Sequence, residues 1–527
     1  MDIGWYSGSE SGEMGSRPVE RTVDFNQVLV WLNAIIAGIT VVGYLQVGGN
    51  AYIDGETIVL ATLLALQTHL SLLVERRRRD PFVILLAFIL ILYHSLRIFT
   101  LLAFPFSFVL DRFAYAPSDS NYALTFILLA NAFLYAGLYV VRGGNRLRIE
   151  VGCWRPTAPL RALAMVLTTI VILYTNGVLW SADSIPRFLR FIVIFLSQNT
   201  VLLMALAYFL LFRKSMARAY AVAFLGLLVL EMVLHSLAGS RSAFIYSLQN
   251  ILLVLLAANG SIALRRRHVL MGVAMVPPAV ILLIASFTIS TFIVASTAVG
   301  KPFSLRTALE TSRLPTELLN RDYALQAGLP VMLSRAGFFD YSAEVIAHSH
   351  EYAKVVNAPA YARSVIDNLL TPGFDIFDQP KISNAMRFVY ADKGNPSKIG
   401  SAEEYQSDQL GIYGELYVLF GYASLPVFFV GAFMFKRAYM ALRTPDAFIL
   451  TMTRVATLFM FAVVVNSFGL DWALFDLLPL VAAIYLYRYF FAVAPDGRIR
   501  PVTGQDLTPP SDPRSHSASS GISFVLS

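Results

Sequence analysis

The chain contains about a dozen long apolar segments and one polar stretch of about 110 residues, 299–408, which lies between two of them. Each apolar segment approaches or exceeds the roughly 20 residues that a helix needs to cross a bilayer. We therefore predict an all-α fold, a polytopic transmembrane helical bundle with one large extracytoplasmic loop of short helices. The twelve predicted spans are residues 26–46, 57–74, 81–104, 121–141, 160–180, 187–212, 219–238, 241–259, 269–297, 409–435, 447–468 and 471–493.

The composition indicates that the bilayer is the solvent for most of the chain. Hydrophobic residues make up 57% of the 527 residues and charged residues only 14%, whereas a soluble domain carries about 25% charged residues. The net charge of +7 is spread over short clusters between spans, which indicates orientation and argues against nucleic-acid binding. The single cysteine, Cys153, excludes an internal disulfide and a cysteine metal cluster.

Basic residues give the predicted orientation. Clusters of Lys and Arg follow spans 2, 4, 6, 8, 10 and 12, beginning with the run Arg76–Arg79, whereas loop 47–56 contains none. The positive-inside rule therefore places both termini in the cytoplasm and residues 299–408 outside. In a bacterium this describes a multi-pass protein of the inner membrane whose large loop lies in the periplasm.

This orientation divides the chain into five predicted regions. They are a cytoplasmic tail (1–25), spans 1 to 9 (26–298), the large periplasmic loop (299–408), spans 10 to 12 (409–493) and a cytoplasmic tail (494–527). The last tail is rich in Pro, Ser and Gly, a composition typical of disorder.

The large loop has a composition suited to helices and to anion binding. Segments 303–320 and 340–357 show helix-like spacing of apolar residues, and helical hairpins on the membrane face would fit them. A guanidinium group stays charged and can bind phosphate through two hydrogen bonds. Arg335 is the best candidate, because its neighbours at 331–341 are largely apolar and a charge there needs a partner or a ligand. Further candidates for substrate binding in this loop are Arg313, Arg387 and His348.

Two arginines lie at the predicted outer edge of the membrane, where ionisable residues are costly and become functional candidates. Arg241 stands among small residues in the short turn before span 8, where the start of a helix favours an anion. The alternative is an arginine that extends to the interface and marks the span end. Arg97, with His94, lies in the outer half of span 3, and its alternative is a structural ion pair with Glu231.

Two carboxylates in the spans are the other candidates. Glu231 and His235 share one face of span 7, and a structural hydrogen bond is the simpler reading for them. Glu415 lies near the outer end of span 10, close to the large loop. It could act as a base if a proton donor lies close by, or form a salt bridge to an arginine.

Several familiar catalytic motifs are missing from the sequence. It has no Walker A motif, no His-Glu-x-x-His and no Gly-x-Ser-x-Gly. The large loop also lacks a dense carboxylate pair that would hold a divalent metal. We therefore expect a mechanism that needs no metal, no ATP and no cofactor.

The order of three short motifs resembles the O-antigen polymerase family, the oligosaccharide repeat unit polymerases of bacterial polysaccharide assembly. Gly-Ser-Arg at 239–241 opens a span, and Leu-Ser-Arg-Ala-Gly-Phe-Phe-Asp at 333–340 follows in the large loop. Gly-Glu-Leu-Tyr-Val-Leu-Phe-Gly-Tyr at 414–422 then leads into a late span that contains Gly431. The resemblance covers about residues 200–435.

This resemblance implies a membrane glycosyltransferase of the C-type superfamily that polymerises lipid-linked repeat units. The donor would be a growing glycan on undecaprenyl pyrophosphate, and the acceptor a lipid-linked repeat unit. Arg241 would hold the pyrophosphate, Arg335 would share its charge, and Glu415 would orient or deprotonate the acceptor. Arg97 and Tyr417 join Arg313, His348 and Arg387 as substrate-binding candidates. Membrane lipids and a chain-length regulator are the other partners that it implies.

Three other functions compete with this interpretation. A transporter or flippase of lipid-linked glycan would have the same span count and orientation, but its charges should gather at mid-membrane. A ligase that moves finished glycan to another acceptor would share the topology, the arginines and the donor. A non-catalytic scaffold would not need buried arginines. Sugar identity, linkage and oligomeric state do not follow from the sequence.

The topology can be tested by labelling in intact cells with a membrane-impermeant thiol reagent, after Cys153 is replaced by serine. A cysteine at position 350 should react, because the large loop is predicted to face outward, and a cysteine at position 145 should not. Labelling at 145 but not at 350 would overturn the predicted orientation.

Overall fold

A computed structural model describes the following parts of the chain: residues 4–5, 22–78, 80–103, 115–141, 149–150, 203, 206–207, 209–210, 217–237, 243–259, 263–265, 270, 274, 339–367, 376–377, 382, 411–443, 447–466 and 524–526. The helices are α1 (Phe25–Val47), α2 (Gly55–Arg78), α3 (Pro81–Leu90), the π-helical turn η1 (Ile91–Ser95), α4 (Leu96–Ala103), α5 (Pro117–Val140), α9 (Arg218–Leu237), α10 (Ala243–Asn259), α16 (Phe339–Ala347), α17 (Ser349–Ala353), α18 (Ala358–Val365), α20 (Gly411–Phe420), the 3₁₀ turn η9 (Gly421–Ser424), α21 (Leu425–Ala441) and α22 (Ala447–Asn466).

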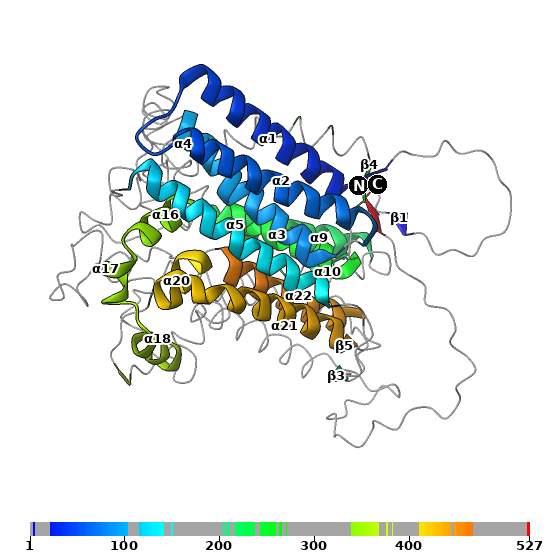
Figure 1. The fold of residues 1–527 in the computed structure, drawn as a ribbon. Coiled ribbons are helices and arrows are strands. Elements are labelled where there is room, and N and C mark those ends of the chain that lie inside the picture. The colour runs from blue at the N-terminus through cyan, green and yellow to red at the C-terminus, as the bar shows by residue number, and fades with distance from the viewer. Residues whose placement is uncertain are drawn as a thin grey trace, which may run out of the picture.

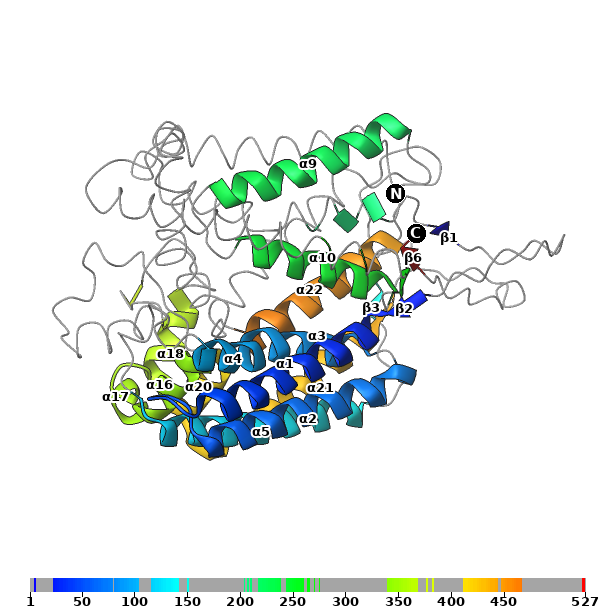
Figure 2. The same ribbon diagram turned by 90° about the horizontal axis from the view of Figure 1, so that it is seen from above.

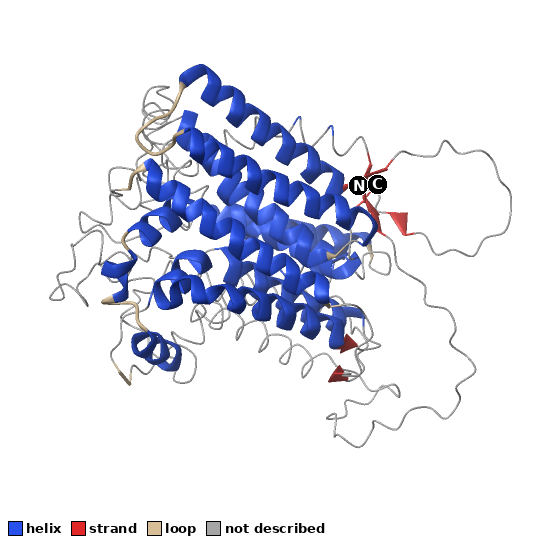
Figure 3. Ribbon diagram, in the orientation of Figure 1, coloured by secondary structure: helices blue, strands red, loops and turns tan. Residues whose placement is uncertain are grey.

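The described residues form a helical bundle with a few very short strands (Figures 1 and 3). Five stretches are long and apolar enough to cross a membrane, namely Phe25–Val47, Gly55–Glu75, Pro81–Ala103, Pro117–Val140 and Gly411–Ala441. The strands are β1 (Gly4–Trp5), β2 (Thr22–Asp24), β3 (Ile149–Glu150), β4 (Ala263–Arg265), β5 (Leu442–Arg443) and β6 (Phe524–Leu526). The chain is therefore a helical membrane protein, as predicted.

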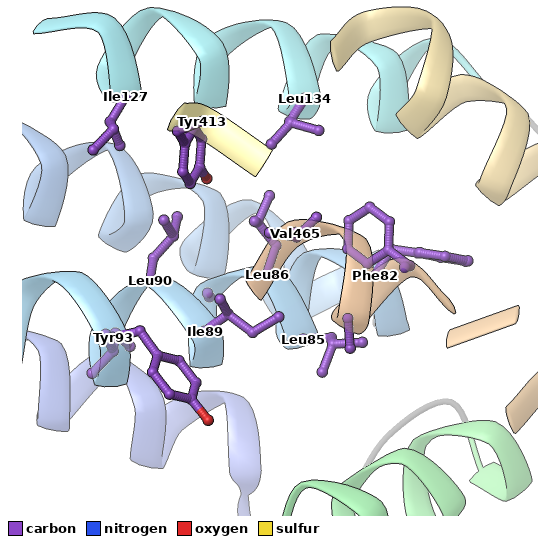
Figure 4. Packing of buried hydrophobic residues seen from close by; sticks show 14 of the residues in the cluster. Phe82, Leu85, Leu86, Ile89, Leu90, Tyr93, Ile127, Leu134, Tyr413 and Val465 are labelled. Atoms are coloured by element: carbon purple, nitrogen blue, oxygen red, sulfur yellow. The ribbon is translucent and has the colours of Figure 1, made fainter. Parts of the chain in front are cut away.

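The continuous segment α3–η1–α4 is the centre of the bundle. In its most apolar stretch 78% of the residues are buried inside the protein, whereas in that of α1 only 22% are buried. Seen from above, α22 lies between this central segment and α10, and α9 lies furthest out (Figure 2). Side chains such as Leu86, Ile89 and Leu90 fill the space towards α5, α20 and α22 (Figure 4).

The two ends of the bundle carry different parts of the chain. We call the end with α16, α17 and α18 the outer end, and the opposite end, with both termini, the inner end (Figure 1). At the inner end the strands join in the order β1–β6–β4–β2, and β3 pairs with β5. One sheet thus joins both termini and the loop after predicted span 8, the other joins the loops after predicted spans 4 and 10, and both lie at the inner end.

Acidic residues begin several helices by accepting hydrogen bonds from free backbone N–H groups. Asp24 accepts from the Asn26 nitrogen, and Asp80 accepts from the Phe82 nitrogen at 3.0 Å. Burial raises the pKa of Asp54, but hydrogen bonds from Thr57 and Asn121 outweigh it and leave the pKa below its ordinary value. This network therefore stabilises the fold above the unfolded-state pKa of Asp54, and the contribution is lost as the pH falls.

Buried amides and small residues hold neighbouring helices together, as is common in membrane bundles. Asn33 on α1 donates a hydrogen bond of 2.7 Å to the Ala65 carbonyl oxygen on α2. On α5, Gly137 faces α21 so closely that an added Cβ would lie 2.3 Å from the Phe429 carbonyl oxygen.

The stretch Gly411–Ala441 is apolar, as predicted for span 10, but it forms a hairpin and not one straight helix. The chain reverses at Gly421, whose φ of +56° is a left-handed conformation that glycine adopts easily. Tyr413 stacks on Phe428, with ring centroids 5.7 Å apart. The two rings meet across the hairpin because both lie about equally far from the turn.

Contacts with α5 give the depth of the hairpin. Tyr417 and Tyr422 touch Tyr122 near the start of α5, whereas Tyr413 donates a hydrogen bond to Asn131, nine residues further along that helix. Helix α20, with ten residues, is about 15 Å long and rises from the middle of the bundle to the outer end. Helix α21 then runs from the outer end to the inner end.

The other predictions have mixed outcomes. Helices are present, as predicted, in the segments predicted as spans 26–46, 57–74, 81–104, 121–141, 219–238, 241–259 and 447–468. The helix predicted within 340–357 is present as α16 and α17, but α16 is buried in the bundle and does not lie on the membrane face. Segments 160–180, 269–297, 303–320 and 471–493, and most of 187–212, lie outside the described residues.

Gly137→Ala should destabilise the bundle by about 1–3 kcal/mol, the usual cost of overpacking. The new methyl group would meet a backbone oxygen of α21, which cannot rotate away. Gly38→Ala is the matched control, because a Cβ at Gly38 on α1 meets nothing within 4 Å. Thermal unfolding in detergent gives the comparison, and equal midpoints for the two variants would contradict the close α5–α21 contact.

Candidate functional site

An ion pair fixes part of the large loop inside the bundle. Arg97, on α4, donates from Nε to Asp340 Oδ1 at 3.1 Å and from Nη2 to Asp340 Oδ2 at 2.8 Å. Both side chains are fully buried, and 243 residues separate them in the chain. Because an unpaired charge in such a place would be very costly, each residue depends on the other.

Asp340 begins a row of ionisable residues that runs along α16 to His348, the residue directly after this helix. Asp340, Glu344 and His348 are spaced four residues apart, so they lie on one face of the helix. His348 Nδ1 lies 3.3 Å from Glu344 Oε1 and 3.2 Å from the Glu344 carbonyl oxygen. The His348 side chain is 31% exposed and that of Glu344 is 6% exposed. The row thus leads from a buried ion pair towards the surface of the outer end.

Tyr115 is a buried hydroxyl close to this row. Burial raises its pKa well above the ordinary value, the Asp340 charge raises it further, and the Arg97 charge opposes that. The phenol therefore stays protonated and can donate a hydrogen bond. Among the described residues its hydroxyl has no hydrogen-bond partner, so it could bind a polar group of a ligand.

The π-helical turn η1 places another polar side chain in the bundle core. His94 is only 1% exposed and lies edge-on to the Tyr413 ring, with centroids 5.4 Å apart. Tyr413 in turn donates to Asn131 Oδ1 at 2.7 Å. Within the described part of the chain, neither ring nitrogen of His94 has a hydrogen-bond partner, and the same holds for Ser95 Oγ. Turns of this kind are often found at functional sites.

Glu415, on the rising helix α20, borders an apolar groove. The groove has a volume of about 230 Å³ and lies between α20, α21 and α22, with Leu134 of α5 also in its wall. Apart from Glu415, its lining consists of apolar side chains and Gly431. Met434 and Val430 in its wall are 62% and 49% exposed, so it opens on the outer surface of the bundle, where lipid chains would lie. Glu415 itself is 3% exposed.

Tyr417 belongs to a group of three tyrosines at the tip of the hairpin. Its hydroxyl lies 2.7 Å from that of Tyr122, and Tyr422 packs edge-on against both rings at 5.9 Å. Tyr122 and Tyr422 are 42% and 41% exposed. Exposed tyrosines are typical of the membrane–water interface, and the composition of the hairpin tip suits that depth.

The structure brings several of the predicted site residues to one end of the bundle. Arg97 and His348 lie on or against α16, and Glu415 and Tyr417 lie on α20, which packs against α16. Arg241, Arg335, Arg313 and Arg387 lie outside the described residues, as does the side chain of Glu231. The carboxylate that binds Arg97 is Asp340.

Sequence reasoning missed Asp340, Glu344 and Tyr115. The spacing of Asp340, Glu344 and His348 within a segment already predicted to be helical was a signal for the first two. Nothing in the sequence pointed to Tyr115. Among the described residues, no three His, Cys, Asp or Glu side chains gather as metal ligands would.

Comparisons with known proteins return no relative. No family model, no curated protein and no solved structure matches this chain.

Removing one partner of the Arg97–Asp340 pair should cost about 3–5 kcal/mol, because it leaves a buried charge alone. Arg97→Met and Asp340→Leu should each lower the unfolding temperature in detergent. The double variant should recover much of that loss, since it buries no charge. Single variants as stable as the wild type, or a double variant that shows the full sum of both losses, would contradict the pairing.

Proposed function

We propose that the chain is a membrane glycosyltransferase that polymerises undecaprenyl-pyrophosphate-linked oligosaccharide repeat units at the periplasmic face of the bacterial inner membrane. In this proposal it has twelve spans and both termini in the cytoplasm. The observation that carries it is one juxtaposition. The large loop brings the charged row of α16 into the outer end of the bundle, beside α20, whose Glu415 borders an apolar groove on the lipid-facing surface.

This juxtaposition suits an amphiphilic substrate. A lipid-linked glycan has a hydrocarbon chain in the bilayer, an anionic pyrophosphate at the interface and sugars in water. The groove is apolar and faces the bilayer, whereas His348, which directly follows α16, reaches the surface of the outer end. The two environments meet along helix α20. Its Glu415 lines the groove, and its Tyr417, two residues further on, belongs to the tyrosine group at the hairpin tip.

The reaction needs positive charge for the leaving group. As the acceptor hydroxyl oxygen bonds to the anomeric carbon, the bond from that carbon to the pyrophosphate oxygen breaks, and negative charge grows on the pyrophosphate. Asp340 already neutralises Arg97, so Arg97 serves better to hold the loop in place. The resemblance assigns the charge of the leaving group to Arg241 and Arg335, with Arg313 and Arg387 as further candidates. Glu415 as the base also stays a prediction.

Glycan from a deletion strain tests the proposed reaction. If the chain is a polymerase, the strain should carry single repeat units and no long chains. Repeat units would still cross the membrane and be transferred to the final acceptor, but they would not be joined to one another. Finished polymer retained on the lipid carrier would instead indicate a ligase. Repeat units retained on the cytoplasmic side would indicate a flippase. Unchanged glycan would remove all three.

Complementation of that strain with Gly431→Leu tests the groove. A Cβ at Gly431 meets nothing within 4 Å, so leucine fits there and fills the groove. We expect shorter chains or none, at wild-type protein level, because the hydrocarbon chain of the substrate loses its place. Gly38→Leu on α1 is the matched control, since it also meets open space and lies far from the groove in the sequence. Full-length polymer with Gly431→Leu would separate the groove from the activity.

A further inference from the structure

We propose that His348, held by Glu344, is the group that takes the proton from the acceptor hydroxyl. The inference rests on the proposed function and names its proton acceptor. It starts from the only described acid–base pair in the loop helices that combines a buried carboxylate with a part-exposed imidazole.

Hydrogen bonding fixes the tautomer of the His348 ring. Its Nδ1 faces two acceptors, the Glu344 carbonyl oxygen at 3.2 Å and the Glu344 carboxylate at 3.3 Å. Neither can donate a hydrogen when the carboxylate is ionised, so Nδ1 must carry the hydrogen. In the neutral ring the lone pair is then on Nε2, the form that a proton acceptor needs.

The pair also lies where an acceptor hydroxyl can reach it. His348 is 31% exposed and ends the row that starts at the Arg97–Asp340 ion pair. Glu415, the alternative, is 3% exposed and borders a groove lined otherwise by apolar side chains and Gly431. A sugar hydroxyl loses hydrogen bonds to water when it enters such a groove, but keeps them beside His348.

The elements packed against α16 bring further charged and titratable groups. They are Arg97 on α4, Asp119, Tyr122, Tyr135 and Tyr139 on α5, His350, Glu351 and Tyr352 on α17, and Tyr413, Glu415 and Tyr417 on α20. Tyr115, just before α5, responds to the charges of both Asp340 and Glu344. Asp340 is paired with Arg97, whereas Glu344 lies 3.3 Å from His348 Nδ1 and can stabilise an imidazolium there.

The proton transfer balances without any further reagent. The acceptor oxygen bonds to the anomeric carbon while its O–H bond breaks, and the proton passes to His348 Nε2. The bond from the anomeric carbon to the pyrophosphate oxygen breaks, and its electron pair leaves with the pyrophosphate. The imidazolium, stabilised by Glu344, then returns the proton to water at the outer face.

The test compares purified full-length variants on lipid-linked repeat units isolated from the deletion strain. His348→Asn keeps an N–H close to the position of Nδ1, so the bond to Glu344 can persist, but it removes Nε2. We expect the rate of chain growth to fall about 10²–10⁴-fold. The fall in wild-type activity that protonation of the imidazole causes at low pH should also disappear. Glu344→Gln should reduce the rate less, because the ring keeps its base. His350→Asn is the matched control, an exposed histidine two residues away, and should behave as the wild type.

Two measurements separate a catalytic role from a structural one. Unfolding temperatures of His348→Asn and His350→Asn should agree, which would exclude loss of fold as the cause. Modification by diethyl pyrocarbonate, read by peptide mass spectrometry, should reach His348 in the wild type and slow when lipid-linked units are added.

A wild-type rate and pH profile in His348→Asn, in a preparation where the wild type makes polymer, would overturn the role of His348 and leave the proposed function intact. Absence of polymer from the wild-type protein itself would instead reject the proposed function, and this inference with it.

Discussion

The ion pair between Arg97 and Asp340 is the interaction on which the outer end of the molecule depends. A guanidinium inside an apolar bundle needs a carboxylate, and this one comes from the large loop, 243 residues further along the chain. The pair therefore holds α16 between the bundle helices. Glu344, His348 and the contact between α16 and α20 all follow from that position.

The hairpin of α20 and α21 also depends on the pairing of buried polar groups. Helix α20 begins near mid-bundle, where Tyr413 bonds to Asn131 and its ring faces His94. Its other end reaches the interface, where Tyr417 meets Tyr122. One short helix thus joins a polar interior, a lipid-facing groove and the water boundary. An amphiphilic substrate would contact the same three environments.

Placement also decides which ionisable groups suit chemistry and which suit structure. Arg97 is a predicted substrate-binding residue, and in the structure both carboxylate oxygens of Asp340 accept hydrogen bonds from its guanidinium. Glu415 is the base that the sequence predicts, and the structure places it at the edge of an apolar groove. His348 is a predicted substrate-binding residue of the large loop, and only the structure shows its contact with the buried carboxylate of Glu344.

The sequence by itself determined the membrane class, the positions of the long helices in the described part of the chain, and the location of both termini at one end of the bundle. These follow from local properties, because segment length, apolar content and charge clusters act through the bilayer and need no knowledge of tertiary contacts. Only the tertiary structure decided that α16 enters the bundle, that Gly411–Ala441 turns back at Gly421, and that Asp340 is the partner of Arg97. Each depends on contacts between residues distant in sequence, or on one left-handed glycine, which apolar periodicity does not encode.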